Sequence, residues 1–201
     1  MVKVGIINYN VGNLGSLINA FRRVDSEPII INEPSELMSV DAVVLPGVGS
    51  FDAAMSRLGR FRDDLSKVRG SVPMLGICLG LQVMFEGSDE GSLSGLSWYL
   101  GRVSRLGGPR VPHIGWDLVR SVRPCEILDG NGYFYFMHSY AVINPGNDLP
   151  YSGITRYGDG NILSVLCDKR SMTFGVQFHP EKSGKRQGLE VLRHFIGFVR
   201  K

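Results

Sequence analysis

Residues 73–82 read PMLGICLGLQ, an apolar run that leads into the pattern glycine, any residue, cysteine, any residue, glycine. This pattern is typical of a buried strand that turns sharply into a helix, with a nucleophile at the turn. Glycines on both sides of Cys78 allow the turn without Cβ clashes, and the N-terminus of the following helix favours a thiolate. The stretch predicts a parallel sheet with Cys78 at the carboxyl end of a strand, where the N–H of Leu79 faces an oxyanion site.

Apolar strands alternate with helical segments over the first half of the chain. Apolar runs at residues 2–7, 29–31 and 42–45 are each followed by helix-compatible sequence, and residues 14–21 carry the apolar stripe of one helix face. Strands that are apolar at every position and alternate with helices indicate a parallel sheet covered on both faces.

The second half of the chain has a different pattern. After about residue 96, apolar and polar positions alternate between frequent glycines and prolines, which is typical of antiparallel strands. The expected elements are strands at 101–105, 116–120 and 133–140, a hairpin of 162–166 with 173–178, and a closing helix over 189–199. We therefore predict an α/β fold with a mixed, largely parallel central sheet flanked by helices and an antiparallel extension. With 201 residues, the chain is expected to form a single domain, residues 1–201.

Composition narrows the class of protein. The net charge of +3 is small and the basic residues are dispersed, so no nucleic-acid partner is expected. No apolar run is long enough to cross a bilayer and no cleavable signal pattern opens the chain, so we expect a cytoplasmic protein without a membrane partner. The three cysteines, Cys78, Cys125 and Cys167, are odd in number and widely spaced. We interpret them as neither a disulfide framework nor a metal or redox pair, and we expect no metal and no cofactor.

A candidate base stands in residues 176–183, which read VQFHPEKS. A thiol nucleophile needs a base within reach, and an imidazole needs a group that fixes its tautomer. His179 and Glu181 supply both, because the proline between them ends the strand and lets the carboxylate curl back. His113 and His138 have no acid at comparable spacing. The competing interpretation is that Cys78 is a buried core residue and His179 is structural.

A glycine loop forms a third element. Residues 45–51 read LPGVGSF and follow an expected strand. By itself this is an ordinary turn from a strand to a helix. Beside the cysteine turn, however, the N–H groups of Val48 and Gly49 are candidates for a second part of the oxyanion hole, because glycines permit unusual dihedral angles and close approach to a substrate.

Taken together, GICLGLQ (76–82) and FHPEKS (178–183) resemble the class I, or triad, glutamine amidotransferases. The resemblance implies that Cys78 attacks the side-chain amide of glutamine, that ammonia leaves, and that water hydrolyses the thioester. It also implies that Gly47 and Gln82 help to hold the substrate glutamine.

Within that family, five segments look like the glutaminase subunits of imidazole glycerol phosphate synthases. They are residues 12–14, 45–51, 84–88, 112–116 and 135–140. This resemblance implies a heterodimer with a (β/α)8-barrel cyclase that consumes the ammonia in histidine biosynthesis. The residues it implies at the partner face are Asn13, Trp116, Tyr135, His138 and Lys182. The chain departs from the usual pattern at Asn10, where glycine is more common, and at Asp117, where asparagine is more common.

Three other interpretations share part of this pattern. A glutaminase serving an anthranilate, aminodeoxychorismate or pyridoxal phosphate synthase would carry the same cysteine turn and triad. A catalytically silent binding subunit would keep the fold, but it would not need Cys78, His179 and Glu181 together. A stand-alone cysteine hydrolase of the peptidase type would fit the turn alone, and turnover of glutamine against peptides separates it from the others.

Overall fold

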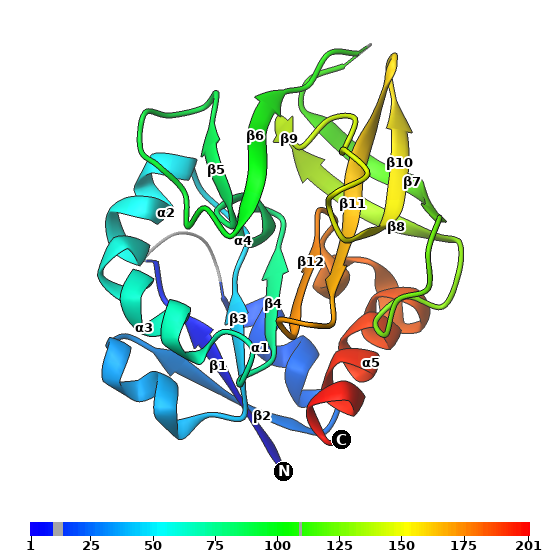
Figure 1. Cartoon of the computed structure of the whole chain (residues 1–201). Helices are drawn as coiled ribbons and strands as arrows, with labels where there is room; N and C mark the ends of the chain where they lie inside the picture. The colour runs from blue at the N-terminus through cyan, green and yellow to red at the C-terminus, as the bar shows by residue number, and fades with distance from the viewer. Residues whose placement is uncertain (10–13, 109) are drawn as a thin grey trace.

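The computed structural model describes residues 1–9, 14–108 and 110–201 (Figure 1). Asn10 and Asn13 lie outside these residues. Within them, no helix has both the length and the apolar character needed to cross a bilayer. The helices are α1 (Gly15–Arg22), α2 (Phe51–Leu58), α3 (Arg62–Val68), α4 (Leu79–Gln82) and α5 (Leu189–Val199). The strands are β1 (Val2–Ile7), β2 (Ser26–Ile31), β3 (Ala42–Leu45), β4 (Met74–Ile77), β5 (Phe85–Ser88), β6 (Tyr99–Arg105), β7 (His113–Ser121), β8 (Gly132–His138), β9 (Tyr140–Ala141), β10 (Tyr151–Tyr157), β11 (Gly160–Asp168) and β12 (Thr173–Val176).

Nine of the described strands form one mixed sheet in the order β2-β1-β3-β4-β12-β11-β10-β7-β8. The strands from β2 to β12 run parallel to one another. From β12 to β8 each strand is antiparallel to its neighbour, and these strands stand together on the right of Figure 1. Strands β5, β6 and β9 form a second, smaller sheet. The predicted mixed α/β sheet with an antiparallel extension is confirmed.

The parallel half of the sheet is buried on both faces. In β3, Ala42 and Val44 belong to the core that includes residues of α1 and α5, whereas Val43 and Leu45 belong to the core that includes residues of α2 and α3. Successive side chains of a strand point to opposite faces. A strand covered by helices on both sides therefore needs apolar residues at every position, which is why the continuous apolar runs predicted this half of the fold.

The strand expected over 133–140 is divided in two. Strand β8 ends at His138, and after Ser139 the short strand β9 leaves the main sheet and pairs with β6. The alternation of apolar and polar residues does not encode this break, because both strands keep the same period of two. The break places residues 137–140 beside Cys78, in the wall of the same cavity. The sequence pattern also does not predict β5 or β10, and α4 is only four residues long.

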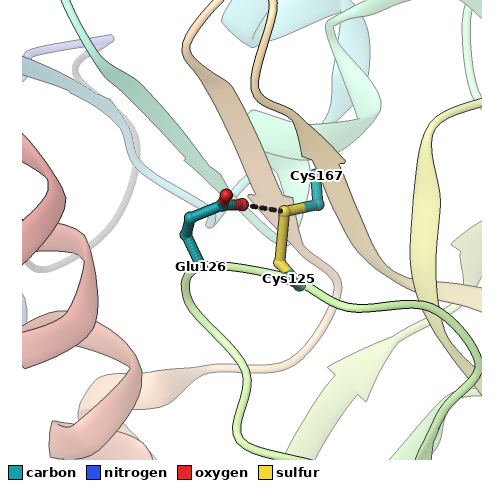
Figure 2. A group of neighbouring side chains, drawn as sticks. All are labelled: Cys125, Glu126 and Cys167. Carbon is teal, nitrogen blue, oxygen red and sulfur yellow. Dashed lines mark hydrogen bonds between the residues drawn. A yellow bond between two sulfur atoms is a disulfide. The ribbon is translucent and has the colours of Figure 1, made fainter.

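Cys125 and Cys167 form a disulfide, so the expectation that these cysteines are unpaired is wrong. Cys125 lies between β7 and β8, Cys167 lies near the end of β11, and their Cα atoms are 5.9 Å apart. Figure 2 shows the carboxylate of Glu126 beside the bond, 3.3 Å from the Cys167 sulfur. The two cysteines are 42 positions apart in sequence, and only the folded sheet brings them together. The odd number is explained by Cys78, which is free.

Reduction of this disulfide is expected to destabilise the protein. The bond closes a loop of 42 residues, which is worth about 4 kcal/mol of chain entropy in the unfolded state. For a chain of this size, that corresponds to a fall in Tm of roughly 10 °C. Thermal unfolding with and without a reductant measures the effect, and the Cys125→Ser/Cys167→Ser double variant is the control because reductant has no bond to break in it. Equal Tm values for the oxidised and reduced protein would contradict a stabilising role.

Candidate active site

Cys78 stands at a sharp turn between β4 and α4, as the glycine-flanked pattern predicts. Its φ is 49° and its ψ is −104°, a conformation that residues other than glycine rarely adopt. The packing is so close that a Cβ on Gly80 would lie 1.9 Å from the carbonyl oxygen of Leu45. Glycine is therefore required at position 80, and the strained turn presents the thiol at the carboxyl end of β4.

The loop after β3 packs against the same turn. A Cβ on Gly47 would lie 2.0 Å from the carbonyl oxygen of Ile77, so glycine is required for this approach as well. Val48 and Gly49 follow and line a cavity together with Cys78. The loop thus lies beside the thiol, where N–H donors would meet a developing oxyanion. Its role as an oxyanion hole stays a prediction.

His179 follows β12 and is held against Glu181 by a short 3-10 turn (Pro180–Lys182). Nδ1 of His179 and Oε1 of Glu181 are 2.8 Å apart, and both side chains are buried. The hydroxyl of Ser183 donates a hydrogen bond to the carbonyl oxygen of His179 and accepts one from the N–H of Tyr135, which fixes the turn to β8. Glu181 therefore orients the ring. Nε2 of His179 has no hydrogen-bond partner among the described residues.

The protonation of His179 depends on its two neighbours. Burial by itself lowers the pKa of His179, whereas the negative charge of Cys78 and the carboxylate of Glu181 raise it. The net effect raises the pKa of His179 to about 10, so the ring is an imidazolium at neutral pH. A thiolate beside an imidazolium is the resting state of an activated cysteine nucleophile.

A cavity of about 260 Å³ opens above the thiol. It lies beyond the carboxyl ends of β3 and β4, where open α/β sheets bind ligands. Its lining combines apolar contacts, peptide groups and the side chain of Glu90, whose carboxylate accepts a hydrogen bond from the N–H of Phe51 at 2.8 Å. The lining residues are Gly47, Val48, Gly49, Cys78, Leu79, Gln82, Glu90, Pro112, Met137, His138, Ser139 and Tyr140.

Two glutamines connect the thiol to the cavity wall. Nε2 of Gln177 lies 3.4 Å from the Cys78 sulfur, and Oε1 of Gln177 accepts a hydrogen bond from Gln82 at 3.2 Å. Gln82 also donates to the carbonyl oxygen of Tyr140 at 2.7 Å. Sequence reasoning selected Gln82 and missed Gln177 and Glu90. The signal for Gln177 was its place directly after the final strand, two positions before His179.

The residues expected at a partner face separate into two groups. Trp116 and Tyr135 face each other across β7 and β8 with ring centroids 6.2 Å apart, and Trp116 is 55% exposed. Lys182 is exposed. His138, in contrast, is buried and lines the cavity, so its position does not support a direct contact with a partner. Asn13 lies outside the described residues.

The arrangement is suited to acyl transfer. A thiol and candidate oxyanion donors line one cavity, and the buried His179 lies close enough to Cys78 for the charge of Cys78 to raise its pKa. Attack on a carbonyl group and protonation of its leaving group require these groups. Among the described residues, the side chains close enough to hold a metal are Cys125, Glu126 and Cys167. Two of these are joined in the disulfide, so they offer no thiolate to a metal in this form.

Residues 6–198 match the family model of the class-I glutamine amidotransferases. The chain is 38% identical over 198 residues to the imidazole glycerol phosphate synthase subunit HisH of Pyrobaculum aerophilum, with 98% of this chain and 99% of that protein covered. It is 42% identical over 202 residues to the HisH subunit of Methanothermobacter thermautotrophicus, with 98% and 99% covered. For the HisH subunit of Methanocaldococcus jannaschii the identity is 42% over 199 residues, with 96% and 98% covered.

Solved structures share the fold. PurLQS from Thermotoga maritima superposes with a TM-score of 0.77 at 15% identity, covering 99% of this chain and 100% of that chain. A glutamine amidotransferase superposes with a TM-score of 0.75 at 17% identity, covering 98% and 99%. At such identities the similarity establishes the fold alone.

Proposed function

The chain belongs to the class I glutamine amidotransferases and, within them, to the family of HisH subunits of imidazole glycerol phosphate synthase, and from this membership we propose its reaction and its catalytic residues. It hydrolyses glutamine to glutamate and ammonia and passes the ammonia to a cyclase in histidine biosynthesis. The observation that carries the proposal is the strained turn that places Cys78 in the cavity wall, together with a buried His179–Glu181 pair whose histidine interacts with the charge of Cys78.

The first half of the reaction forms a thioester. The thiolate of Cys78 attacks the carbon of the glutamine side-chain amide, and the oxyanion is held by the N–H of Leu79 together with that of Val48 or Gly49. His179 donates its proton from Nε2 to the amide nitrogen, the C–N bond breaks, and ammonia leaves. Glu181 stabilises the imidazolium throughout and keeps the other ring nitrogen protonated.

The second half of the reaction releases glutamate. A water molecule gives a proton to Nε2 of His179 and attacks the thioester carbon. The C–S bond breaks, and the thiolate of Cys78 and the imidazolium are restored for the next cycle. In the substrate complex, Gly47 and Gln82 hold the glutamine, and the carboxylate of Glu90 lies where it complements the substrate ammonium group.

The partner in this proposal is a (β/α)8-barrel cyclase that forms a heterodimer with the chain in the cytoplasm. Support comes from the relatives, which are named as subunits of a synthase. Support also comes from the exposed aromatic face of β7 and β8, where Trp116 and Tyr133 are each more than half exposed. We infer that Trp116, Tyr135 and Lys182 contact the partner around the opening through which ammonia leaves.

The isolated chain is expected to hydrolyse glutamine slowly, and the barrel partner with its nucleotide substrate is expected to increase the rate. The peptide of Val48, flanked by glycines, can rotate its N–H into or out of the oxyanion site. Restoring one such donor raises the rate about a hundredfold or more. Glutamate release is measured for the chain alone, with the partner, and with the partner and nucleotide.

The three assays distinguish a failure of activation by the partner from a failure of the proposed glutaminase function. Equal rates in all three would reject partner-controlled activation and leave the triad intact. No glutamate in any assay, from folded protein in an assembled complex, would reject the proposed function. Trp116→Ala is the variant that tests the interface alone. It removes an exposed ring at the proposed partner contact and leaves the residues that line the cavity unchanged.

A further inference from the structure

A line of hydrogen bonds runs from β7 into the wall of the catalytic cavity. Nε2 of His113 lies 3.2 Å from Oδ2 of Asp117. Nδ1 of the same ring lies 3.2 Å from Nε2 of His138. Nδ1 of His138 in turn lies 2.9 Å from the carbonyl oxygen of Tyr140. Both rings are buried, and the side chain of Asp117 is 33% exposed.

The three contacts need three protons. A carbonyl oxygen only accepts, so Nδ1 of His138 must carry a hydrogen. An ionised Asp117 also only accepts, so Nε2 of His113 must carry another, and the contact between the two rings needs a third. Two neutral imidazoles carry one N–H each. Two neutral rings beside an ionised carboxylate therefore carry one proton too few. All three contacts are hydrogen bonds only when the line holds one extra proton.

The extra proton belongs at the Asp117 end of the line. Burial, with smaller effects of the charges on His113 and His179, lowers the pKa of His138 to about 3, so this ring is neutral. Burial also lowers the pKa of His113 below its ordinary value, and the charge and hydrogen bond of Asp117 offset this only in part. His113 therefore holds the extra proton in mildly acidic solution and loses it as the pH rises. The neutral His138 thus donates from Nδ1 to Tyr140 and accepts at Nε2 from His113.

Loss of the extra proton changes the tautomer of His138. The bond from His113 to an ionised carboxylate is charge-assisted and is about twice as strong as a bond between neutral groups. His113 then keeps its hydrogen on Nε2, facing Asp117, and presents a bare Nδ1 to His138. To satisfy that contact His138 must move its own hydrogen to Nε2, and it can no longer donate to Tyr140.

The Tyr140 carbonyl is where this line meets the substrate cavity. The same oxygen accepts the hydrogen bond from Nε2 of Gln82. We propose that Asp117 and His113 are positioning residues that fix the tautomer of His138, and through the Tyr140 carbonyl hold Gln82 for the substrate glutamine. The proposal rests on the proposed glutaminase function.

Other groups face the two rings from neighbouring elements. The ring of Tyr157 on β10 lies 4.1 Å from that of His113, and Arg110 lines the cavity beside them. On the catalytic side, His138 shares its cavity with Cys78 and Glu90 and is affected by the charge of His179. Asp117 is nevertheless the carboxylate within hydrogen-bond distance of these rings among the described residues.

Asparagine at position 117 changes the proton requirement. An amide offers both an N–H donor and a carbonyl acceptor. Its N–H can donate to Nε2 of His113, and His113 can then donate from Nδ1 to His138. All three contacts are satisfied by two neutral rings, and no extra proton is needed. Asp117→Asn therefore separates the shape of the side chain from its charge.

The test compares wild type with Asp117→Asn, each assembled with the barrel partner. The KM for glutamine is measured from about pH 5 to about pH 7, the window in which a histidine with a lowered pKa loses its proton. In the wild type, KM is expected to rise roughly three- to tenfold with pH as one hydrogen bond to the Tyr140 carbonyl is lost. In Asp117→Asn, KM is expected to stay flat. His113→Phe, which cannot relay a proton, is expected to have a raised KM that does not change with pH.

A second measurement does not depend on turnover. Nitrogen NMR of the imidazoles in the full chain reports which ring atom of His138 carries hydrogen. A shift of that hydrogen from Nδ1 to Nε2 with rising pH in wild type, absent in Asp117→Asn, supports the proposal. Parallel KM profiles for the two proteins, or a His138 tautomer that never changes, would overturn it. A failure of the glutaminase function would instead leave no turnover while the tautomer change persists.

Discussion

Replacement of Cys78 by alanine is expected to lower the rate of glutamine hydrolysis by on the order of a millionfold, because no other group can form the thioester. The substitution removes one atom from an otherwise intact cavity, so the fold and assembly with the partner should persist. Glutamate release from the assembled complex measures the loss.

In Cys78→Ser the thiolate charge disappears. The pKa of His179 is then expected to fall, because Glu181 alone opposes the effect of burial.

The Cys78→Ala chain, assembled with the barrel partner, is expected to run the synthase reaction on ammonium salts at high pH. The chain would then serve only to supply ammonia, which the salt replaces. The Cys125→Ser/Cys167→Ser double variant is the matched control, since it removes the other two sulfurs and should keep glutamine hydrolysis. An active Cys78→Ala protein would contradict the assignment of Cys78 as the nucleophile. An assembled variant complex unable to use ammonium would show that the chain takes part directly in the second reaction.

Replacement of His179 by alanine is expected to cost nearly as much as loss of the nucleophile, whereas Glu181→Gln should cost roughly a hundredfold less. In the proposed reaction, His179 donates and accepts the proton at Nε2, so its loss removes both the acid and the base. Glutamine in place of Glu181 keeps an acceptor for Nδ1 but removes the charge that supports the imidazolium. Single-turnover rates of thioester formation measure both effects.

The pH dependence adds a second check on these roles. The pKa of His179 is raised to about 10, so the imidazolium is present below that pH and is lost as the pH rises through it. The wild-type rate should therefore fall on the alkaline side near pH 10, and Glu181→Gln should move that fall to lower pH because one of the charges that raise the pKa is gone. A larger loss from Glu181→Gln than from His179→Ala would reverse the assigned roles.

The sequence predicted those turns and strands that depend on only a few neighbouring residues. The turn at Cys78 follows from glycines at 76 and 80, because backbone clashes forbid any larger residue there. The parallel strands follow from continuous apolar runs, because a strand covered on both faces must be apolar at every position. Residues 133–140 show the limit of this reasoning, since the break at Ser139 depends on pairing of β9 with β6.

The sequence by itself therefore determined the mixed α/β fold, the cysteine at the strand end, and the His179–Glu181 pair two residues apart. Only the tertiary structure decided contacts between distant segments, such as the Cys125–Cys167 disulfide and the contact of Gln177 with Cys78, 99 positions away in sequence. The physical reason is that turn sterics and side-chain periodicity act over a few neighbouring residues. Contacts such as that between His113 and His138 are instead set by the register of strands, which the whole sheet fixes together.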